Sequence, residues 1–327
     1  MEIPQPPRTA PAVRRLGLGM AALGRPAYHT IGHGTDFPEG RSPEQLRRHA
    51  HAVLDAAYDA GIRHLDAARS YGAGEAFLRA WADARGLGPG DVTVSSKWGY
   101  RYVGGWRVDA EKHEVKDHSL EALRRQHAES VEALGPLLSL YQIHSVTADG
   151  PVLGDGAVLD ELARLRDGGL RIGVTVSGPG QAEAAARALG VERGGRPLFT
   201  AVQGTWNLLE RSCEAVLGEA HASGRLVIVK EPLANGRLGP RGDAGADGPL
   251  ARVARDVGTT PDALALAAAL ARPWADLVLL GAATVDQLRS NLRALELQPS
   301  AEAQERLAAL VEPPARYWAR RATLAWT

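Results

Sequence analysis

The sequence of 327 residues has little cysteine, few aromatic side chains and no long apolar run, and each shortage excludes a class of protein. Cys213 is the only cysteine, so neither an intrachain disulfide framework nor a cysteine-cluster metal site can form, which fits a reducing compartment. No stretch approaches the roughly 18 apolar residues that a membrane span needs. Residues 1–12 hold four prolines and lack the apolar core of a signal peptide. We therefore expect a cytoplasmic protein in which residues 1–12 are flexible.

Neither sign of charge is in excess, because 38 Lys and Arg stand against 38 Asp and Glu. This balance argues against a nucleic acid or a membrane surface as a partner held by charge alone. Lysine is scarce in its own right: Lys97, Lys112, Lys116 and Lys230 are the only four, against 34 arginines. Since an ammonium can lose its proton and a guanidinium cannot, each retained lysine is either a candidate for chemistry or a chance remnant.

The chain is 45% hydrophobic, and short apolar runs alternate about eight times with longer segments of helical spacing. This alternation predicts an α/β protein, a single (β/α)8 TIM barrel domain over residues 1–327. A doubly wound sheet is the rival, but it needs a glycine fingerprint after the first strand, and in Gly17–Gly24 the third glycine comes two positions too late. The expected strands are 16–20, 62–66, 92–97, 138–144, 171–176, 199–203, 226–230 and 277–280. The expected helices are 42–60, 74–85, 119–134, 157–167, 180–189, 210–223, 261–271, 284–295 and 300–311.

Polar side chains end three consecutive predicted strands, at the barrel face where active sites lie. Asp66, Lys97 and His144 stand at these ends, and Tyr71 follows in a loop that can return its phenol to the barrel mouth. An ammonium lowers the pKa of a nearby phenol, a carboxylate holds the ammonium, and a neutral imidazole orients a carbonyl. The four predict a proton-transfer site for a carbonyl or alcohol that needs an external redox cofactor. A purely structural pair of Asp66 and Lys97 is the alternative.

Six segments, in this order and spacing, resemble the aldo-keto reductase superfamily. They are LDAARSYGAGEAFL (65–78), VSSKWG (94–99), YQIHS (141–145), VQGTWNLLE (202–210), KEPLANGRL (230–238) and LGAATVDQLRSNL (280–292). The resemblance implies a catalytic tetrad of Asp66, Tyr71, Lys97 and His144, with Tyr71 as the general acid in reduction. It also implies a nicotinamide cofactor, NADP(H) by preference with NAD(H) as the alternative, and no metal.

The resemblance further implies the cofactor contacts. Ser177 and Gln203 match residues that hold the nicotinamide carboxamide, residues 230–238 match the segment that covers the pyrophosphate, and residues 281–291 match the adenosine site at a helix start. An ordinary polar helix face is the alternative for the last segment. The expected set is Met20, Ser177, Gln203, Lys230, Glu231, Pro232, Leu233, Asn235, Gly236, Leu238, Gly281, Ala283, Gln287 and Asn291.

The sequence departs from the family pattern at two positions near the nicotinamide. Lys230 stands where the family usually has an aromatic residue that stacks on the ring, and Trp206 is the candidate substitute. Gly178 follows Ser177 where the family often has Asn or Arg, so one cofactor contact is expected to be missing.

The choice between the two nicotinamide cofactors is open in the sequence. A 2′-phosphate is normally held by Arg or Lys, and Arg289 is the only base within residues 281–291. Arg237 and Arg241 are the other candidates for that contact.

Aromatic side chains make up 5% of the chain and gather in loops expected near the barrel mouth, which predicts an aromatic-walled pocket unless the rings only pack the loops. They are Trp98, Tyr100, Tyr102 and Trp106 in one loop, Tyr28, His29, His33 and Phe37 in another, and Tyr317, Trp318 and Trp326 in the tail. Trp98, Trp106 and Trp206 are the predicted substrate contacts. His29 and His33 have metal-ligand spacing but no carboxylate partner at a suitable spacing, so no metal site is expected there.

Together these observations predict an NAD(P)-dependent aldo-keto reductase that interconverts a small aldehyde or ketone with its alcohol. An NAD-linked sugar or lactol dehydrogenase is the alternative within the same chemistry. A cofactor-binding regulatory subunit with little turnover, and a cofactor-free hydrolase or lyase, are alternatives of other classes. The sequence predicts no oligomeric state.

Overall fold

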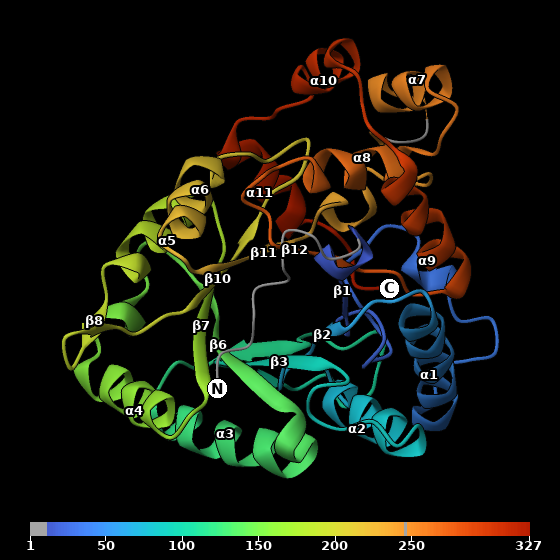
Figure 1. Ribbon diagram of the computed structural model, residues 1–327. Helices are drawn as coiled ribbons and strands as arrows, with labels where there is room; N and C mark the ends of the chain where they lie inside the picture. The colour runs from blue at the N-terminus through green and yellow to red at the C-terminus, as the bar shows by residue number, and fades with distance from the viewer. Residues whose placement is uncertain (1–11, 245–246) are drawn as a thin grey trace.

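Eight parallel strands close into a barrel in a computed structural model that describes residues 12–244 and 247–327 (Figure 1). Around the ring the order is β1, β12, β11, β10, β7, β6, β3 and β2. The strands are β1 (Leu16–Gly19), β2 (His64–Asp66), β3 (Thr93–Trp98), β6 (Leu138–Val146), β7 (Arg171–Val176), β10 (Ala201–Thr205), β11 (Leu226–Lys230) and β12 (Leu277–Leu280). Because the first and last strands pair with each other, the predicted (β/α)8 barrel is confirmed and the doubly wound sheet is excluded. The predicted flexible segment 1–12 lies, apart from Ala12, outside the described residues.

Helices surround the ring on its outer side, and the sequence predicts where most of them begin (Figure 1). They are α1 (Pro43–Asp59), α2 (Gly74–Ala84), α3 (Leu120–Leu134), α4 (Gly156–Asp167), α5 (Gln181–Leu189), α6 (Glu214–Ala222), α8 (Pro261–Leu270), α9 (Val285–Leu292) and α10 (Ala301–Ala308). Helix α1 shows the local cause: Ser42 Oγ accepts from the Gln45 N–H at 3.3 Å, and Gln45 Oε1 accepts from the Ser42 N–H at 2.9 Å. This reciprocal capping satisfies two backbone donors at the first turn.

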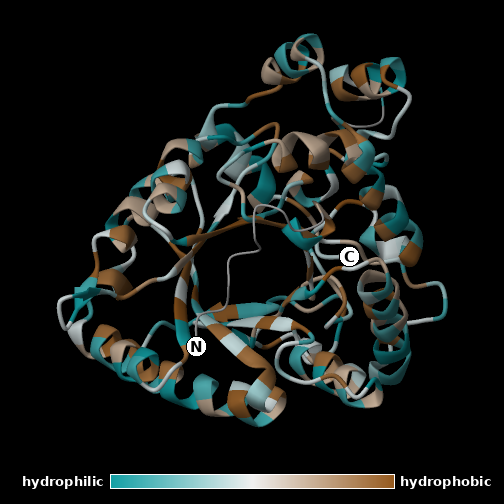
Figure 2. Cartoon of the chain, in the orientation of Figure 1, coloured by the Kyte–Doolittle hydropathy of each residue, from teal (hydrophilic) through white to brown (hydrophobic). Residues whose placement is uncertain are grey.

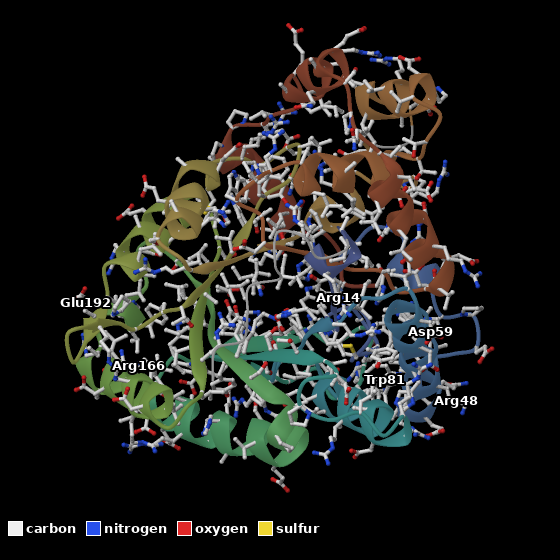
Figure 3. The ribbon with its side chains drawn as sticks, in the orientation of Figure 1. Arg14, Arg48, Asp59, Trp81, Arg166 and Glu192 are labelled. Atoms are coloured by element: carbon white, nitrogen blue, oxygen red, sulfur yellow. The ribbon has the colours of Figure 1, made fainter. Side chains whose placement is uncertain are left out.

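The core lies between the strands and the inward faces of the helices. Strand β11 shows the pattern, with Val227, Ile228 and Val229 fully buried, as parallel strands covered on both faces require. Figure 2 shows the hydrophobic residues of several helices facing the strands and the hydrophilic ones facing outward. In Figure 3, Arg48 projects from the rim of the molecule, whereas Trp81 of α2 lies inward, where its indole Nε1 donates to Asp55 of α1 at 2.8 Å.

Four strands and two helices were not predicted, because they belong to segments whose fold depends on what they pack against. A hairpin of β4 (Tyr100–Tyr102) and β5 (Glu114–Lys116) rises from the loop after β3, and β8 (Glu192–Arg193) pairs with β9 (Arg196–Pro197). Helix α7 (Pro249–Asp256) packs with α10 outside α8, and α11 (Pro314–Ala322) follows α10 (Figure 1). Within the described residues, no helix is long and apolar enough to cross a membrane.

Candidate active site

The barrel register brings the predicted catalytic side chains to one end of the barrel. Asp66 ends β2 opposite Gly19 on one side and Ser95 on the other, and Lys97 lies opposite Gln142 of β6. A cavity of about 650 Å³ opens at this end. Its wall includes Asp66, Tyr71 and His144, while Lys97 lies beneath them, 1% exposed.

The Asp66 carboxylate is the hub of a buried hydrogen-bond network. Lys97 Nζ donates to its Oδ2, and Ser95 Oγ donates to its Oδ1 at 2.6 Å. The side-chain amides of Gln142 and Gln203 approach the same Oδ1 at 3.4 and 3.3 Å. A buried ion pair is stable only when further hydrogen bonds satisfy its remaining atoms, and these neighbours do so. The network fixes the Lys97 ammonium in one position.

Tyr71 meets this ammonium: its hydroxyl lies 3.4 Å from Lys97 Nζ. Two glycines let the Tyr71 loop return to the barrel mouth. Gly72 has a φ of +61°, and a Cβ on Gly24 would come within 2.2 Å of the Tyr71 carbonyl oxygen, so the loop after β1 presses directly on the Tyr71 loop. The predicted convergence of Asp66, Lys97 and Tyr71 is therefore present in the structure.

The acidity of Tyr71 differs from the expectation. Burial raises the pKa of Tyr71 well above its ordinary value, the Asp66 carboxylate raises it further, and the Arg25 guanidinium opposes both. The pKa is therefore not lowered as expected, because burial and then the charge of Asp66 raise it. Tyr71 is consequently a protonated phenol at neutral pH, which is the form that donates a proton.

A bulge in β6 directs His144 into the cavity. The pairing of β6 with β7 shifts register between Ile143 and Val146, and Ser145 adopts a φ of +52°. The Ser145 N–H donates to Thr175 Oγ1 at 2.6 Å, which replaces a ladder hydrogen bond. Bulges of this kind re-aim side chains beside active sites.

His144 is neutral in this setting. Its ring packs edge to face on Tyr71, with centroids 5.6 Å apart at 81°. Burial and the charges of Lys97 and Lys230 lower the pKa of His144 well below its ordinary value. The neutral ring expected from the sequence therefore follows from its surroundings, and it can hydrogen-bond to a substrate oxygen.

Sequence reasoning missed Arg25, which links the Tyr71 loop to the cavity wall. Arg25 is 1% exposed, and its guanidinium lies 5.1 Å from the Tyr71 ring centroid, 5.2 Å from Tyr28 and 4.8 Å from Trp326. Its Nη1 also donates to Glu114 Oε1 at 2.6 Å. No local sequence pattern distinguishes Arg25 from the other arginines among the 34, because its partners come from four separate segments of the chain.

Most of the residues expected to contact the cofactor border the cavity. They are Ser177, Gln203, Lys230, Glu231, Pro232, Leu233, Asn235, Gly236, Gly281, Ala283, Gln287 and Asn291. Met20 and Leu238 are wrong, because both are fully buried: Met20 packs in the barrel core and Leu238 in a satellite cluster with α7 and α8.

The loop after β11 combines strained backbone with an unpartnered polar atom, as ligand-binding loops often do. Glu231, Ala234 and Asn235 adopt φ values of 53°, 49° and 53°, a region that non-glycine residues rarely occupy. Asn235 is 6% exposed and its Oδ1 has no hydrogen-bond partner. Strained backbone and orphaned polar atoms gather at binding sites, so this loop fits the pyrophosphate segment that the resemblance implies.

The end of β11 provides no aromatic platform. Lys230 Nζ donates to Thr205 Oγ1 at 2.7 Å, and burial lowers the pKa of Lys230 to about 8. Trp206 is wrong as the substitute: it is fully buried, donates to Glu214 Oε2 at 3.0 Å and packs on Trp274. Its ring therefore belongs to the packing between β10 and α6.

The other two predicted substrate contacts do not line the cavity either. Trp98 is fully buried in the core, and Trp106 is partly buried, with its indole donating to the Arg41 carbonyl at 2.8 Å. The aromatic wall comes instead from other rings of the predicted loops: Tyr28, His29, Tyr100 and Trp326. In the described part of the chain, no group of three or more His, Cys, Asp or Glu side chains could hold a metal ion.

Comparisons with known proteins identify the family of the chain. The model of the aldo/keto reductase family matches residues 15–312. No curated protein matches the sequence. An aldo-keto reductase from Bacillus halodurans in its holo form has 22% identity and a TM-score of 0.66, over 91% of this chain and 92% of that one. A Pseudomonas aeruginosa protein assigned to the aldo-keto reductases has 23% identity and a TM-score of 0.62, over 89% and 91%.

Structural likeness at such low identity is evidence for the fold alone. The family model, in contrast, spans most of the sequence, from the start of the barrel to the segment before α11. On this match, the chain belongs to the aldo/keto reductase family.

Proposed function

We propose that the protein is an NAD(P)-dependent oxidoreductase that reduces a small aldehyde or ketone to its alcohol, or runs the reverse reaction. The single observation that carries the proposal is the partly buried Tyr71 hydroxyl, 3.4 Å from the Lys97 ammonium in the cavity region lined by Tyr71 and His144. When bound, the nicotinamide supplies the hydride that a carbonyl carbon receives.

Tyr71 and His144 act together on the carbonyl oxygen. The neutral His144 ring orients and polarises this oxygen, and the Tyr71 hydroxyl donates its proton as negative charge develops there. The phenolate left behind is stabilised by the Lys97 ammonium, 3.4 Å from its oxygen, and by the Arg25 guanidinium, 5.1 Å from its ring centroid, until a proton returns from solvent. In the oxidative direction the same phenolate accepts the proton of the alcohol.

Other residues of this chain suit the cofactor itself. Ser177 and Gln203 border the cavity near the tetrad and can hold the carboxamide, and the backbone N–H groups of the strained 231–236 loop can meet phosphate oxygens. The unpartnered Oδ1 of Asn235 is an acceptor within this loop. We further propose one catalytic domain working in the cytoplasm, where a chain with a single thiol stays reduced.

Steady-state turnover tests the proposal directly. The protein is incubated with NADH or NADPH and a panel of aldehydes and ketones, and with the oxidised cofactors and a panel of alcohols and aldoses, while nicotinamide absorbance is followed. We expect turnover that the Tyr71→Phe variant lacks. If no substrate of either panel is turned over faster by the wild type than by Tyr71→Phe, the proposed function is wrong.

A further inference from the structure

One end of the cavity, here named the adenosine end, is formed by Asp36, Arg241, Asp262, Gln287 and Asn291. Asp36 enters it from the loop after β1 and is 5% exposed. Gln287 Nε2 donates to Asp36 Oδ1 at 2.9 Å, and Gln287 Oε1 accepts from the Ala283 N–H at 2.8 Å. The Asp36 carboxylate is thereby tied to the start of α9.

The loop that carries Asp36 is itself fixed across the cavity. The Ile31 N–H donates to the Asn235 carbonyl at 3.0 Å, and Asn235 Nδ2 donates to the His29 carbonyl at 3.2 Å. His33 Nδ1 lies 3.4 Å from Asp36 Oδ2. Together with the hydrogen bond from Gln287, these contacts give the Asp36 carboxylate a defined position in the cavity wall.

Two buried acceptors at this end lack partners. Asn291 Nδ2 donates to Asp262 Oδ2 at 2.7 Å, but Asn291 Oδ1 and Asp262 Oδ1 accept no hydrogen bond. Both residues are 3% exposed and border the cavity. Buried acceptors are normally satisfied, so the pair fits a ligand that brings N–H donors, as the amino group of adenine does.

The basic residues that could hold a 2′-phosphate are already engaged. Arg237 is 4% exposed, is absent from the cavity wall, and lies between Asp243 and Glu312, with its shortest contact at 2.7 Å. Arg289 projects into solvent and pairs with Asp286 at 3.3 Å. Arg241 does border the cavity, but its Nη2 donates to Asp36 Oδ1 at 2.9 Å.

The charged side chains that border the adenosine end are therefore mostly negative. Asp36, Asp262 and Asp286 border the cavity here, and Arg241 is the one cation among the wall residues of this end that the structure describes. A carboxylate accepts a hydrogen bond from a ribose 2′-hydroxyl and repels a 2′-phosphate. The wall thus favours the hydroxyl.

We propose that Asp36 is a specificity-determining residue that makes the adenosine end select NAD(H) over NADP(H). The proposal rests on the proposed function, because it assumes that the cavity takes a nicotinamide dinucleotide, and it replaces the NADP(H) preference expected from the family resemblance. It assigns selectivity to a carboxylate of the first loop, although the family resemblance directs attention to residues 281–291.

The test measures binding and needs no turnover. Isothermal titration compares ADP-ribose with 2′-phospho-ADP-ribose, which differ only in the 2′ group. We expect ADP-ribose to bind the wild-type protein at least about tenfold more tightly at low salt, with a ratio that falls as salt is added. In Asp36→Asn, which keeps a side-chain oxygen for Gln287, we expect 2′-phospho-ADP-ribose to gain several-fold and ADP-ribose to change little.

Two further variants sharpen the result. Asp286→Asn is the matched control, because this carboxylate borders the same end but is 92% exposed, and we expect it to leave the ratio within about twofold. Arg241→Gln distinguishes the opposite model, in which Arg241 leaves Asp36 to hold the phosphate. A selective loss of 2′-phospho-ADP-ribose binding in Arg241→Gln would support that model and overturn ours.

The remaining outcomes separate the inference from the proposed function. If the two ligands bind equally, or the phosphorylated one binds more tightly, the role of Asp36 is wrong and the dinucleotide site stands. If neither ligand binds the folded wild-type protein, the cavity is not a dinucleotide site and both proposals fall together. Thermal melting of each variant shows whether it is folded.

Discussion

Replacing Tyr71 by Phe removes one hydroxyl and leaves the rest of the site in place. The Tyr71 ring keeps its edge-to-face contact with His144 at 5.6 Å and its position 5.1 Å from Arg25, because neither contact uses the oxygen. Lys97 keeps Asp66 as its partner. The variant therefore isolates the contribution of the proposed proton donor.

The expected loss follows from general acid catalysis. A positioned acid contributes roughly 10² to 10⁴ in rate, which corresponds to about 3–5 kcal/mol of barrier height. We expect the single-turnover rate of carbonyl reduction by Tyr71→Phe to fall by that factor. Cofactor affinity, measured by fluorescence titration, should change by less than about threefold, and the free energy of unfolding by less than about 1 kcal/mol.

Tyr100→Phe is the matched control. The Tyr100 ring also borders the cavity and packs on His144 at 5.1 Å, and the substitution removes the same atom. We expect it to keep at least about a third of the wild-type rate, because its hydroxyl makes no contact with Lys97 in the structure. Retention of more than about a tenth of the rate by Tyr71→Phe, with Tyr100→Phe unchanged, would refute the assignment of the donor.

Three further outcomes follow from the charged groups of the site. The reductive rate should stay level between about pH 6 and pH 7, because burial holds the pKa of Tyr71 above this window and that of His144 below it, and Lys230 titrates only near its pKa of about 8. A fall within this window in the pH–rate profile would contradict this. Lys230→Met should raise the pKa of His144, since the Lys230 charge lowers it, and nitrogen NMR of labelled histidine would show the shift or its absence. The Arg321 guanidinium and the Lys230 charge lower the pKa of Glu231 to about 2. Glu231 therefore stabilises the fold at pH values above 4.5, its pKa in the unfolded chain, and this contribution is lost as the pH falls toward 2. In urea unfolding, the free energy of unfolding of the wild type should therefore exceed that of Glu231→Gln by a margin that is up to about 3 kcal/mol smaller at pH 2 than at pH 7. A margin that does not change with pH would contradict this role of Glu231.

The barrel itself was predictable, because each strand and helix carries its own local signal. Strand β11 is an unbroken apolar run ending at Lys230, and α1 has a serine cap followed by proline. The predicted strands and helices agree with the structure to within a few residues at most ends. The additions, such as β4–β5 and α7, lie in the segments between the barrel elements, and their order depends on tertiary contacts.

The positions of Asp66, Lys97 and His144 at one end of the barrel were predictable for the same reason, and the aromatic wall of the cavity was not. A polar side chain at the end of a buried strand must face the barrel mouth, which placed Asp66, Lys97 and His144. No such rule fixes an indole in a loop: Trp98 and Trp106 turned into the core or onto backbone, while Tyr28 and Trp326 took the cavity wall. Aromatic residues satisfy either environment, and only packing decides between them.

The amino-acid sequence alone determined the order of elements, the closed barrel that this order implies, and the residues at the strand ends, because these depend on periodicity and position along the chain. Tertiary structure decided the chemistry of the individual groups. The acidity of Tyr71 depends on how deeply it is buried and on the pairing of Asp66 with Lys97. Asp36 meets Gln287, a residue 251 positions away, because β1 pairs with β12 when the ring closes. Burial and long-range charge are properties of the folded chain, and no local pattern encodes them.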